Sequence, residues 1–354
     1  MSNSRQILMS IPQEHQAKDV KEIDLEHEPL PKERALGVSW LADDDTLQIS
    51  VGNKVPRFTR RGLISHYSTV YDPLGLVTPF ILIARLMYRE ECKLQKGWDD
   101  ELEPETHRKF LRWLDQLPEM KSVAIPRCIS TTGLKTAVAV ELHHFCDASE
   151  NAYAAVTYLR VVQSNGEIHC AYVFGKARLS PLKGDTIPRM ELQAAVLAVE
   201  KHLMIVEEMR LSYDDVYFWS DSMVVLGWIK NDDAKLPKYI DRRVTSIREA
   251  SGADQWRQVL TDVNPADTAT RGSINVTKWL RATAFLYSNH DWQCLHTSRF
   301  AVDSNPPKRT SAGQAASEDG TVGSTHQRFS FGRYTSCSTR EYHGCHREAD
   351  QLSF

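Results

Sequence analysis

The chain has 354 residues, of which 42% are apolar and 25% charged, and its formal net charge is −3. That length has room for about two or three domains. The net charge excludes a global attraction to nucleic acid, so any nucleic-acid surface must be a local patch. The seven cysteines show no repeated spacing, which favours an intracellular compartment, cytoplasm or nucleus, over a disulfide framework. No signal peptide is recognisable and no apolar run approaches the ~18 residues of a membrane span, so we expect no membrane partner.

Residues 1–36 are polar, rich in Glu and Lys, and without a sustained hydrophobic period. We expect this segment to be a remnant of something upstream. Residues 37–128 begin with two short apolar runs that predict strands, Gly37–Leu41 and Leu47–Val51. The rest of this stretch is helical in pattern, so a small, mostly helical domain is expected.

Two prolines mark the helices of this small domain. Thr78 and Pro79 have the residue types of an N-cap and a first helical position, and the helix should run to about Gln95. Pro104 opens a second helix with aromatic and leucine side chains at helical spacing along one face.

From residue 137 the spacing of apolar residues changes from the helical period to the two-residue alternation of strands. Three consecutive strands are predicted, and the turn Ser164-Asn165-Gly166 makes a hairpin of the last two. Their predicted bounds are Val138–Asp147, Tyr153–Val162 and Ile168–Ala177.

After this meander, helices alternate with strands. Pro188 begins a long helix to about Met209, and a buried-type strand, Val216–Ser220, follows it. Two helices (222–230 and 238–250), a last strand (255–259) and a helical turn from about 264 complete the unit. The order predicts an α/β fold, a mixed five-stranded sheet with flanking helices. Residues 300–354 are dominated by Ser, Thr, Gly, Gln and His, and we expect a disordered tail.

Four acidic residues stand in short signatures at the ends of these elements. They are Asp147 in Phe-Cys-Asp-Ala-Ser, Glu191 in Pro-Arg-Met-Glu-Leu, Asp221 in Trp-Ser-Asp-Ser and Asp267 in Asn-Pro-Ala-Asp. Each alone has an ordinary structural role open to it, as a cap, a turn or a partner of the helix dipole. As an ordered set they can converge on a hard, oxygen-seeking cation such as Mg²⁺. Two such ions roughly 4 Å apart serve phosphodiester displacement, so the set points to nuclease chemistry.

Basic residues near these acids are candidates for contacting phosphates. Lys176 and Arg178 follow the third strand, and Lys183 and Arg189 flank the approach to Glu191. Lys238, Arg242 and Arg243 lie on a later helix, where acidic neighbours leave a plain solvated face equally open.

The ordered signatures resemble a ribonuclease H domain of the kind found in BEL/Pao-type retrotransposons. The similar stretches are Ser180–Lys183, Thr186–Ala195 and Asp267–Gly272, and upstream Arg60–Leu63 and Tyr71–Pro79. The resemblance covers roughly residues 35–280. It implies that 37–128 is the connection to a reverse transcriptase, a region labelled Pao retrotransposon peptidase, and that 137–285 is a ribonuclease H-like domain.

The resemblance also implies an activity, endonucleolytic cleavage of the RNA strand of an RNA–DNA hybrid. It assigns all four acids to catalysis and to holding two Mg²⁺ ions, with Mn²⁺ as a substitute. In this scheme Asp147 bridges both ions, Glu191 and Asp221 complete one shell, and Asp267 holds the looser ion. The implied partners are the hybrid and the upstream reverse transcriptase portion of the polyprotein.

Departures from the family keep alternatives open. Relatives often carry His before the last acid, where this chain has Gln258, which cannot shuttle a proton. A catalytically inert remnant that only binds nucleic acid is therefore one alternative. A retroelement aspartic peptidase is another, although the sequence contains no Asp-Thr-Gly or Asp-Ser-Gly. No Tyr-x-Asp-Asp polymerase signature occurs either.

Overall fold

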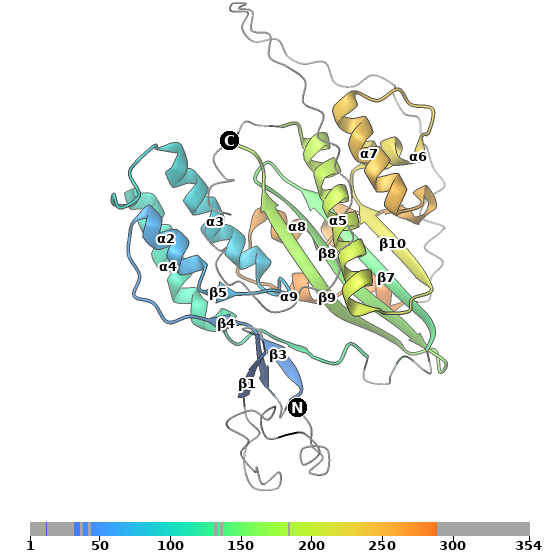
Figure 1. The fold of residues 1–354 in the computed structure, drawn as a ribbon, viewed down its shortest axis with the longest axis horizontal. Coiled ribbons are helices and arrows are strands. Elements are labelled where there is room, and N and C mark those ends of the chain that lie inside the picture. The colour runs from blue at the N-terminus through green and yellow to red at the C-terminus, as the bar shows by residue number, and fades with distance from the viewer. Residues whose placement is uncertain are drawn as a thin grey trace, which may run out of the picture. The chain divides into compact units, whose positions relative to one another are not determined.

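The computed structural model describes residues 12, 32–35, 38–41, 44–130, 134, 137–182 and 185–288. The tail expected over 300–354 and most of the segment 1–36 lie outside the described residues. The described elements divide into an N-terminal group that ends at residue 126 and a larger α/β group that begins at residue 137 (Figure 1).

A mixed five-stranded sheet is the centre of the larger group, in the order β11-β10-β7-β8-β9. β7, β8 and β9 form an antiparallel meander, while β10 runs parallel to both β7 and β11. The predicted fold class is therefore confirmed. The strand bounds are β7 Ala137–Ala148, β8 Ala152–Gln163, β9 Ile168–Leu179, β10 Asp215–Ser220 and β11 Trp256–Gln258.

Three helices contribute to a core on one face of this sheet. The long helix α5 (Ile187–Met209) lies along the strands in Figure 1, and Leu192, Ala195 and Val199 are buried there. α6 (Met223–Lys230) and α7 (Lys238–Ala250) complete the layer. The even-numbered residues Leu142 and Cys146 of β7 point into this core, as the two-residue period of a strand requires.

The N-terminal group contains three helices and two small sheets. The helices are α2 (Arg60–Tyr67), α3 (Thr78–Lys93) and α4 (Pro104–Met120). One sheet has the order β1-β2-β3-β6 and the other pairs β4 with β5. Their bounds are β1 Lys32–Ala35, β2 Val38–Leu41, β3 Thr46–Gln48, β4 Ser50–Val51, β5 Val70–Tyr71 and β6 Ala124–Pro126.

The predicted cap of α3 was wrong by one residue. Val77 is the N-cap, Thr78 is already helical, and no side chain of the cap residue bonds to the backbone. The Asp72 carboxylate instead accepts hydrogen bonds from the backbone N–H groups of Leu76 (2.7 Å) and Val77 (2.8 Å). A carboxylate five residues upstream thus satisfies the turn that leads into the helix.

The opposite face of the large sheet shares a core with the N-terminal group. Phe80 of α3 and Trp113 of α4 are buried in the same apolar cluster as Phe145 and Trp219 of the sheet. Three short C-terminal helices, α8 (Asp267–Arg271), α9 (Thr277–Leu280) and η4 (Ala284–Tyr287), join this cluster through Ala269, Trp279 and Leu286. Two further short elements precede them, η2 (Ala253–Gln255) and η3 (Thr261–Val263). Both faces of the sheet are therefore covered.

None of the helices in the described part of the chain combines the length and apolarity that crossing a membrane requires.

Candidate active site

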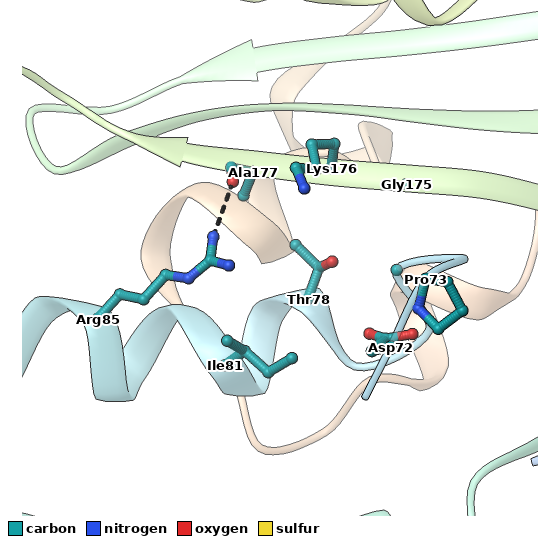
Figure 2. A pocket seen from close by; sticks show the side chains of 9 residues that line it. Asp72, Pro73, Thr78, Ile81, Arg85, Gly175, Lys176 and Ala177 are labelled. Atoms are coloured by element: carbon teal, nitrogen blue, oxygen red, sulfur yellow. Dashed lines mark hydrogen bonds between the residues drawn. The ribbon is translucent and has the colours of Figure 1, made fainter. Parts of the chain in front are cut away.

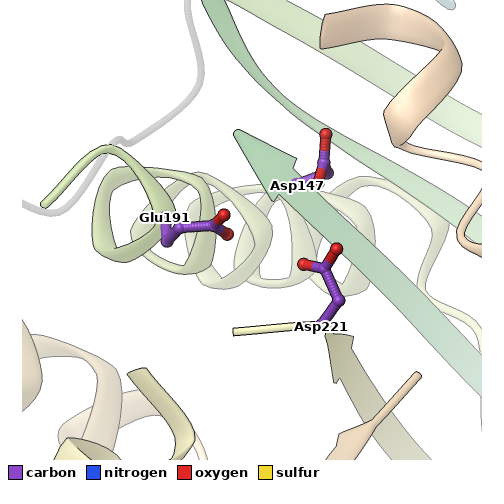
Figure 3. Close-up of side chains that lie close together, drawn as sticks. All are labelled: Asp147, Glu191 and Asp221. Atoms are coloured by element: carbon purple, nitrogen blue, oxygen red, sulfur yellow. The ribbon is translucent and has the colours of Figure 1, made fainter. Parts of the chain in front are cut away.

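Three of the four predicted acids converge at one edge of the large sheet (Figure 3). Asp147 is the penultimate residue of β7, and Asp221 directly follows β10. Because these neighbouring strands are parallel, their carboxyl ends lie together. Glu191 reaches the same place from the N-terminal part of α5. One carboxylate oxygen of each residue lies within 4.8 Å of the others.

Burial and repulsion between the acids oppose ionisation of Asp147 and Glu191. Asp147 is 4% exposed and Glu191 is 9% exposed. Burial, followed by the charge of Asp221 and then that of Asp147, raises the pKa of Glu191 to about 9. Burial also raises the pKa of Asp147 to about 7, against a hydrogen bond from Thr270 that lowers it. Full ionisation of all three acids at this spacing is therefore unfavourable unless a positive charge lies among them.

The positive charge nearest to the triad of Asp147, Glu191 and Asp221 that we identify is Arg271, which lowers the pKa of Asp147 but pairs with Asp267. Within the described residues, no ion pair joins any of the three to a basic side chain. Glu191 Oε2 and Asp221 Oδ1 are buried there without a hydrogen-bond partner. Such atoms are costly unless something compensates them. An all-oxygen, anionic set with two unpaired oxygens fits a hard divalent cation such as Mg²⁺.

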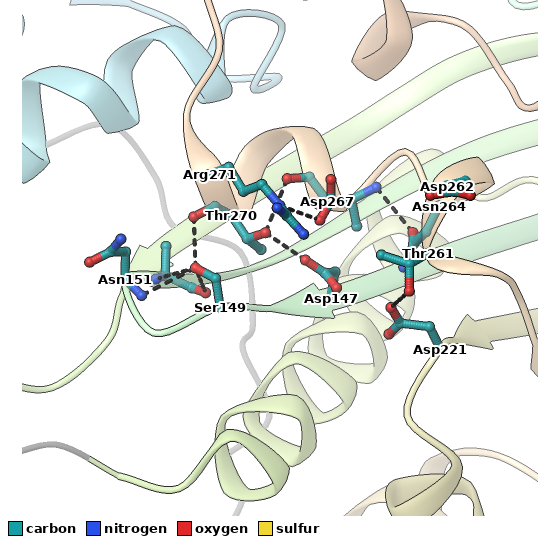
Figure 4. A network of polar contacts seen from close by, with 12 residues as sticks. Asp147, Ser149, Asn151, Asp221, Thr261, Asp262, Asn264, Asp267, Thr270 and Arg271 are labelled. Atoms are coloured by element: carbon teal, nitrogen blue, oxygen red, sulfur yellow. Dashed lines mark hydrogen bonds and ion pairs between the residues drawn. The ribbon is translucent and has the colours of Figure 1, made fainter.

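Asp267 lies beside this triad and is held differently. It is the first residue of α8, and its Oδ1 accepts a 2.7 Å hydrogen bond from Arg271 Nε (Figure 4). Its charge contributes to raising the pKa of Asp147, which places it near the triad. The Thr270 hydroxyl, one turn along, is 2.5 Å from Asp147 Oδ2. Asp267 thus borders the triad with its own counter-charge.

Neutral side chains that the sequence analysis did not single out hold the acids in place. Thr261 donates to Asp221 Oδ2 at 2.7 Å. The fully buried Asn264 donates to the backbone carbonyl of Cys146 at 3.0 Å and so ties β7 to the segment before α8. Thr270 is also fully buried. The stretch Asp267–Gly272 carried the resemblance, but its spacing alone could not show that Thr270 reaches a residue 123 positions away.

The predicted phosphate-binding residues fall into two groups, of which the first lies near the start of α5. Arg189 and Arg243 both pack their guanidinium groups against the ring of Tyr239, at 4.8 and 3.6 Å from the ring centre. Arg189 also pairs with Asp185 at 3.2 Å. Lys238 and Arg242 are exposed on α7.

The second group lies on β9, the edge strand of the sheet. Lys176 is exposed and lines a polar pocket between β9 and the start of α3, together with Asp72 and Arg85 (Figure 2). Arg178 is exposed and pairs with Glu200 at 3.3 Å. Lys183 lies outside the described residues. The structure therefore gathers Arg189 and Arg243 around one ring, while Lys176 and Arg178 stand apart from them.

Gln258 is the last residue of β11 and sits beside Ser220 of β10. Ser220 directly precedes Asp221, so Gln258 is a close neighbour of the strand end that carries a triad residue. The backbone N–H of Val259 donates to the Ser220 carbonyl at 3.1 Å and fixes this register.

The strand order, the placement of the helices and the acidic triad at the carboxyl ends of β7 and β10 together define a ribonuclease H-like α/β protein. Residues 59–222 match the family described as "Pao retrotransposon-like RNaseH-like domain". This similarity supports a fragment of a retrotransposon polyprotein with a ribonuclease H-like domain, as the sequence resemblance predicted. The comparison with curated proteins found no match.

Solved structures of ribonucleases H are similar to part of the chain. RNase H1 from Halobacterium salinarum is 18% identical, and the match covers 36% of this chain and 89% of that one, with a TM-score of 0.25. The N-terminal RNase H domain of a Mycobacterium tuberculosis protein is 10% identical over 37% and 94%, with a TM-score of 0.26. The foamy viral protease-reverse transcriptase is 12% identical over 59% and 36%, with a TM-score of 0.25.

Proposed function

We propose that this protein is a metal-dependent endonuclease of the ribonuclease H type, which cleaves the RNA strand of RNA–DNA hybrids for its retrotransposon. The observation that supports this most is the convergence of three carboxylates within 4.8 Å, two of which have buried oxygens without partners. A structural acid normally has a hydrogen bond or an ion pair, because an uncompensated buried charge is destabilising.

In this proposal the residues have distinct tasks. Asp147, Glu191 and Asp221 hold the divalent cations, two Mg²⁺ or Mn²⁺ ions, and Asp267 contributes at the border. Bound cations of this kind polarise the phosphate, favour an ionised water and stabilise the leaving oxygen. Thr270 and Thr261 each donate to one carboxylate oxygen and thereby fix which oxygens remain available.

The raised pKa values fit this division of tasks. A carboxyl group that loses its proton only when a cation arrives couples cation binding to proton release. Asp147, with its pKa near 7, and Glu191, with its pKa near 9, would then ionise in the presence of the cation. The protein avoids gathering three full charges before the cation binds.

We further propose that the basic residues contact the sugar-phosphate backbones of the hybrid. Lys176, Arg178, Lys238 and Arg242 are exposed on the surface, and Arg189 and Arg243 stack on the ring of Tyr239. Lys183 belongs to the same proposal from its position in sequence. Contacts of this kind supply affinity that falls with salt and carries no base preference.

The domain organisation is also a proposal. Residues 37–128 would be the reverse transcriptase connection and residues 137–285 the nuclease, within a polyprotein whose upstream polymerase portion delivers the hybrid. The protein would act inside the cell. The described elements fall on either side of this boundary, since one group ends at Pro126 and the other begins at Ala137, although both contribute to one apolar core.

The test uses the full chain and a hybrid whose RNA strand carries a 5′ label. The expected result is internal cleavage of RNA with Mg²⁺, none with chelator, and none of the same RNA in single-stranded form. Asp147→Asn is the matched control, because it keeps the size of the side chain and removes its charge. Cleavage that persists in that variant, or in chelator, would refute the proposal.

One observation favours the second candidate, an inert remnant that only binds nucleic acid. Gln258 occupies the strand end beside Ser220, where a proton carrier would stand near the triad. This candidate predicts hybrid binding without cleavage at any Mg²⁺ or Mn²⁺ concentration. The aspartic peptidase alternative has no support in the fold, since the acids sit at the edge of a ribonuclease H-like sheet.

A further inference from the structure

Helix α3 makes a two-pronged contact with the turn between β7 and β8. Arg89 is only 9% exposed, and its Nη1 donates to the Asn151 carbonyl at 2.9 Å. Its Nη2 donates to Asn151 Oδ1 at 2.5 Å. The planar guanidinium presents two parallel N–H groups, which a lysine ammonium cannot do. A residue of the N-terminal group thereby fixes a turn 62 residues further along the chain.

Hydrogen bonds continue from that turn to the triad (Figure 4). The Asn151 backbone N–H donates to Ser149 Oγ at 3.1 Å, and Ser149 Oγ donates to the Thr270 carbonyl at 2.9 Å. The Thr270 hydroxyl in turn lies 2.5 Å from Asp147 Oδ2. Arg89 is therefore connected to Asp147 through three intervening residues.

Helix α3 also contacts the other side of this chain of hydrogen bonds. The Ser273 N–H donates to the Pro79 carbonyl at 3.2 Å, directly after α8. Gly272, with φ +77°, allows this approach, since a Cβ there would lie 3.0 Å from Ile83 Cγ1. The turn at Asn151 and the end of α8 are thus both held by α3.

The chemistry of Arg89 indicates a purpose beyond packing. Its Nε is buried without a hydrogen-bond partner, and the ion pair it makes with Glu90 is long, at 3.9 Å, so the desolvation of this part of the guanidinium is only weakly compensated. A hydrophobic side chain of similar volume stabilises such a site as well or better. What a hydrophobic residue cannot do is fix the two oxygens of Asn151 in one orientation.

We propose that Arg89 is a positioning residue for the nuclease, through which the connection segment sets the geometry of Asp147. This inference rests on the proposed function. Arg89 does not touch substrate or cation; it orients Asn151, which orients Ser149 and α8, and Thr270 then holds the Asp147 carboxylate. The nuclease geometry depends in this way on a helix that precedes the ribonuclease H-like sheet.

The test compares four single variants of the full chain with the double variant Arg89→Lys, Asn151→Ala. Arg89→Lys keeps the positive charge and loses the two parallel N–H donors of the guanidinium. Asn151→Ala removes the side-chain acceptor at an exposed turn and leaves the core unchanged. Asn151→Asp keeps two acceptor oxygens and is the conservative rescue. Lys93→Ala is the control, because Lys93 is an exposed cation of the same helix that pairs with Glu90, a second neighbour of Arg89, and takes no part in the contact with Asn151.

Two readouts are needed, one of them independent of activity. Cleavage should show kcat lower by on the order of 10- to 100-fold in Arg89→Lys and Asn151→Ala, with KM nearly unchanged, since misplacing a group by about 1 Å can cost 10²-fold. The double variant should be no worse than either single variant, because both break one link. Hydrogen exchange should become faster over 148–152 and 267–273 in both, and stay unchanged in Lys93→Ala.

The outcomes separate the two proposals. If the wild type never cleaves, the proposed nuclease fails, while hydrogen exchange still reports whether Arg89 holds α8. A wild type that cleaves, with Arg89→Lys equal to it in kcat and in exchange, overturns the role of Arg89. Additive losses in the double variant would also overturn it, because Asn151 would then act separately from Arg89.

Discussion

Gly175→Ala should destabilise the whole protein, because Gly175 lies where the two groups of elements share their core. A Cβ on this β9 residue would stand 2.1 Å from Trp279 Cζ2 and 2.7 Å from the Tyr172 hydroxyl. Trp279 is fully buried and donates its indole N–H to the Gly75 carbonyl at 2.7 Å. The Gly175 N–H itself donates to the Leu74 carbonyl at 3.0 Å.

The size of the destabilisation depends on how little Trp279 and Tyr172 can move. Overpacking a well-packed core typically costs about 1–3 kcal/mol. The indole cannot retreat without losing its bond to Gly75, so we expect the upper part of that range. Trp279→Phe removes one ring of the indole and should be destabilising alone. In that background, Gly175→Ala should lower the free energy of unfolding much less, because the added methyl group has room.

The assay is urea unfolding of the wild type, the two single variants and the double variant. Each protein should unfold in one cooperative transition, monitored by circular dichroism and fluorescence, with a coupling of roughly 0.5–3 kcal/mol between the two sites. Additive free energies would refute the proposed contact. So would a Gly175→Ala variant as stable as the wild type.

Three further outcomes are expected from the site. Asp221→Asn should abolish Mg²⁺-dependent cleavage and leave the fold intact, and by relieving repulsion it should raise the melting temperature in chelator; cleavage rates and thermal melts check this. Without cations, the contribution of the triad to stability should fall as pH rises from about 4 to 9, because the pKa values of Asp147 (about 7) and Glu191 (about 9) exceed those of the unfolded chain, so the folded state binds more protons. Burial lowers the pKa values of His144 and His202, which gives the opposite trend up to about pH 7, so melts at pH 7.5 and 9 test the sign, which Mg²⁺ should reverse. Gln258→His should speed cleavage by up to on the order of 10²–10⁴, less if product release is limiting; single-turnover rates at equal Mg²⁺ and pH decide, and a folded variant that is no faster would show that this position is not limiting.

Local signals predicted the larger group of elements well. The turn Ser164-Asn165-Gly166 does separate β8 from β9, and Gly166 takes the positive φ of +84° that makes glycine the favoured residue there. The long α5 and the buried strand β10 lie where their hydrophobic periods predicted them. In these segments each residue's preference and its tertiary environment agree.

The N-terminal strands were predicted less well, because distant partners create them. The run expected as one strand, Leu47–Val51, is divided between β3, which pairs with β2 and β6, and β4, which pairs with β5. β6 begins at Ala124, and β1 and β5 carry too few residues for a period to be visible. Pairing over such separations leaves no local pattern.

The same reason limits what the sequence can say about the site. Order and spacing indicated which acids to examine, and the structure brings Asp147, Glu191 and Asp221 together. The side chains that orient them, Thr270 and Asn264, are ordinary polar residues until the fold places them against β7. Their importance comes from contacts between residues that lie more than a hundred positions apart in the sequence.

The central claim is that the triad holds divalent cations, and anomalous diffraction from crystals soaked in Mn²⁺ tests it most directly. The account predicts anomalous density within bonding distance of carboxylate oxygens of Asp147, Glu191 and Asp221, and its loss in Asp221→Asn crystals soaked in the same way. Fully soaked wild-type crystals with Mn²⁺ bound elsewhere and none at the three carboxylates would contradict the claim.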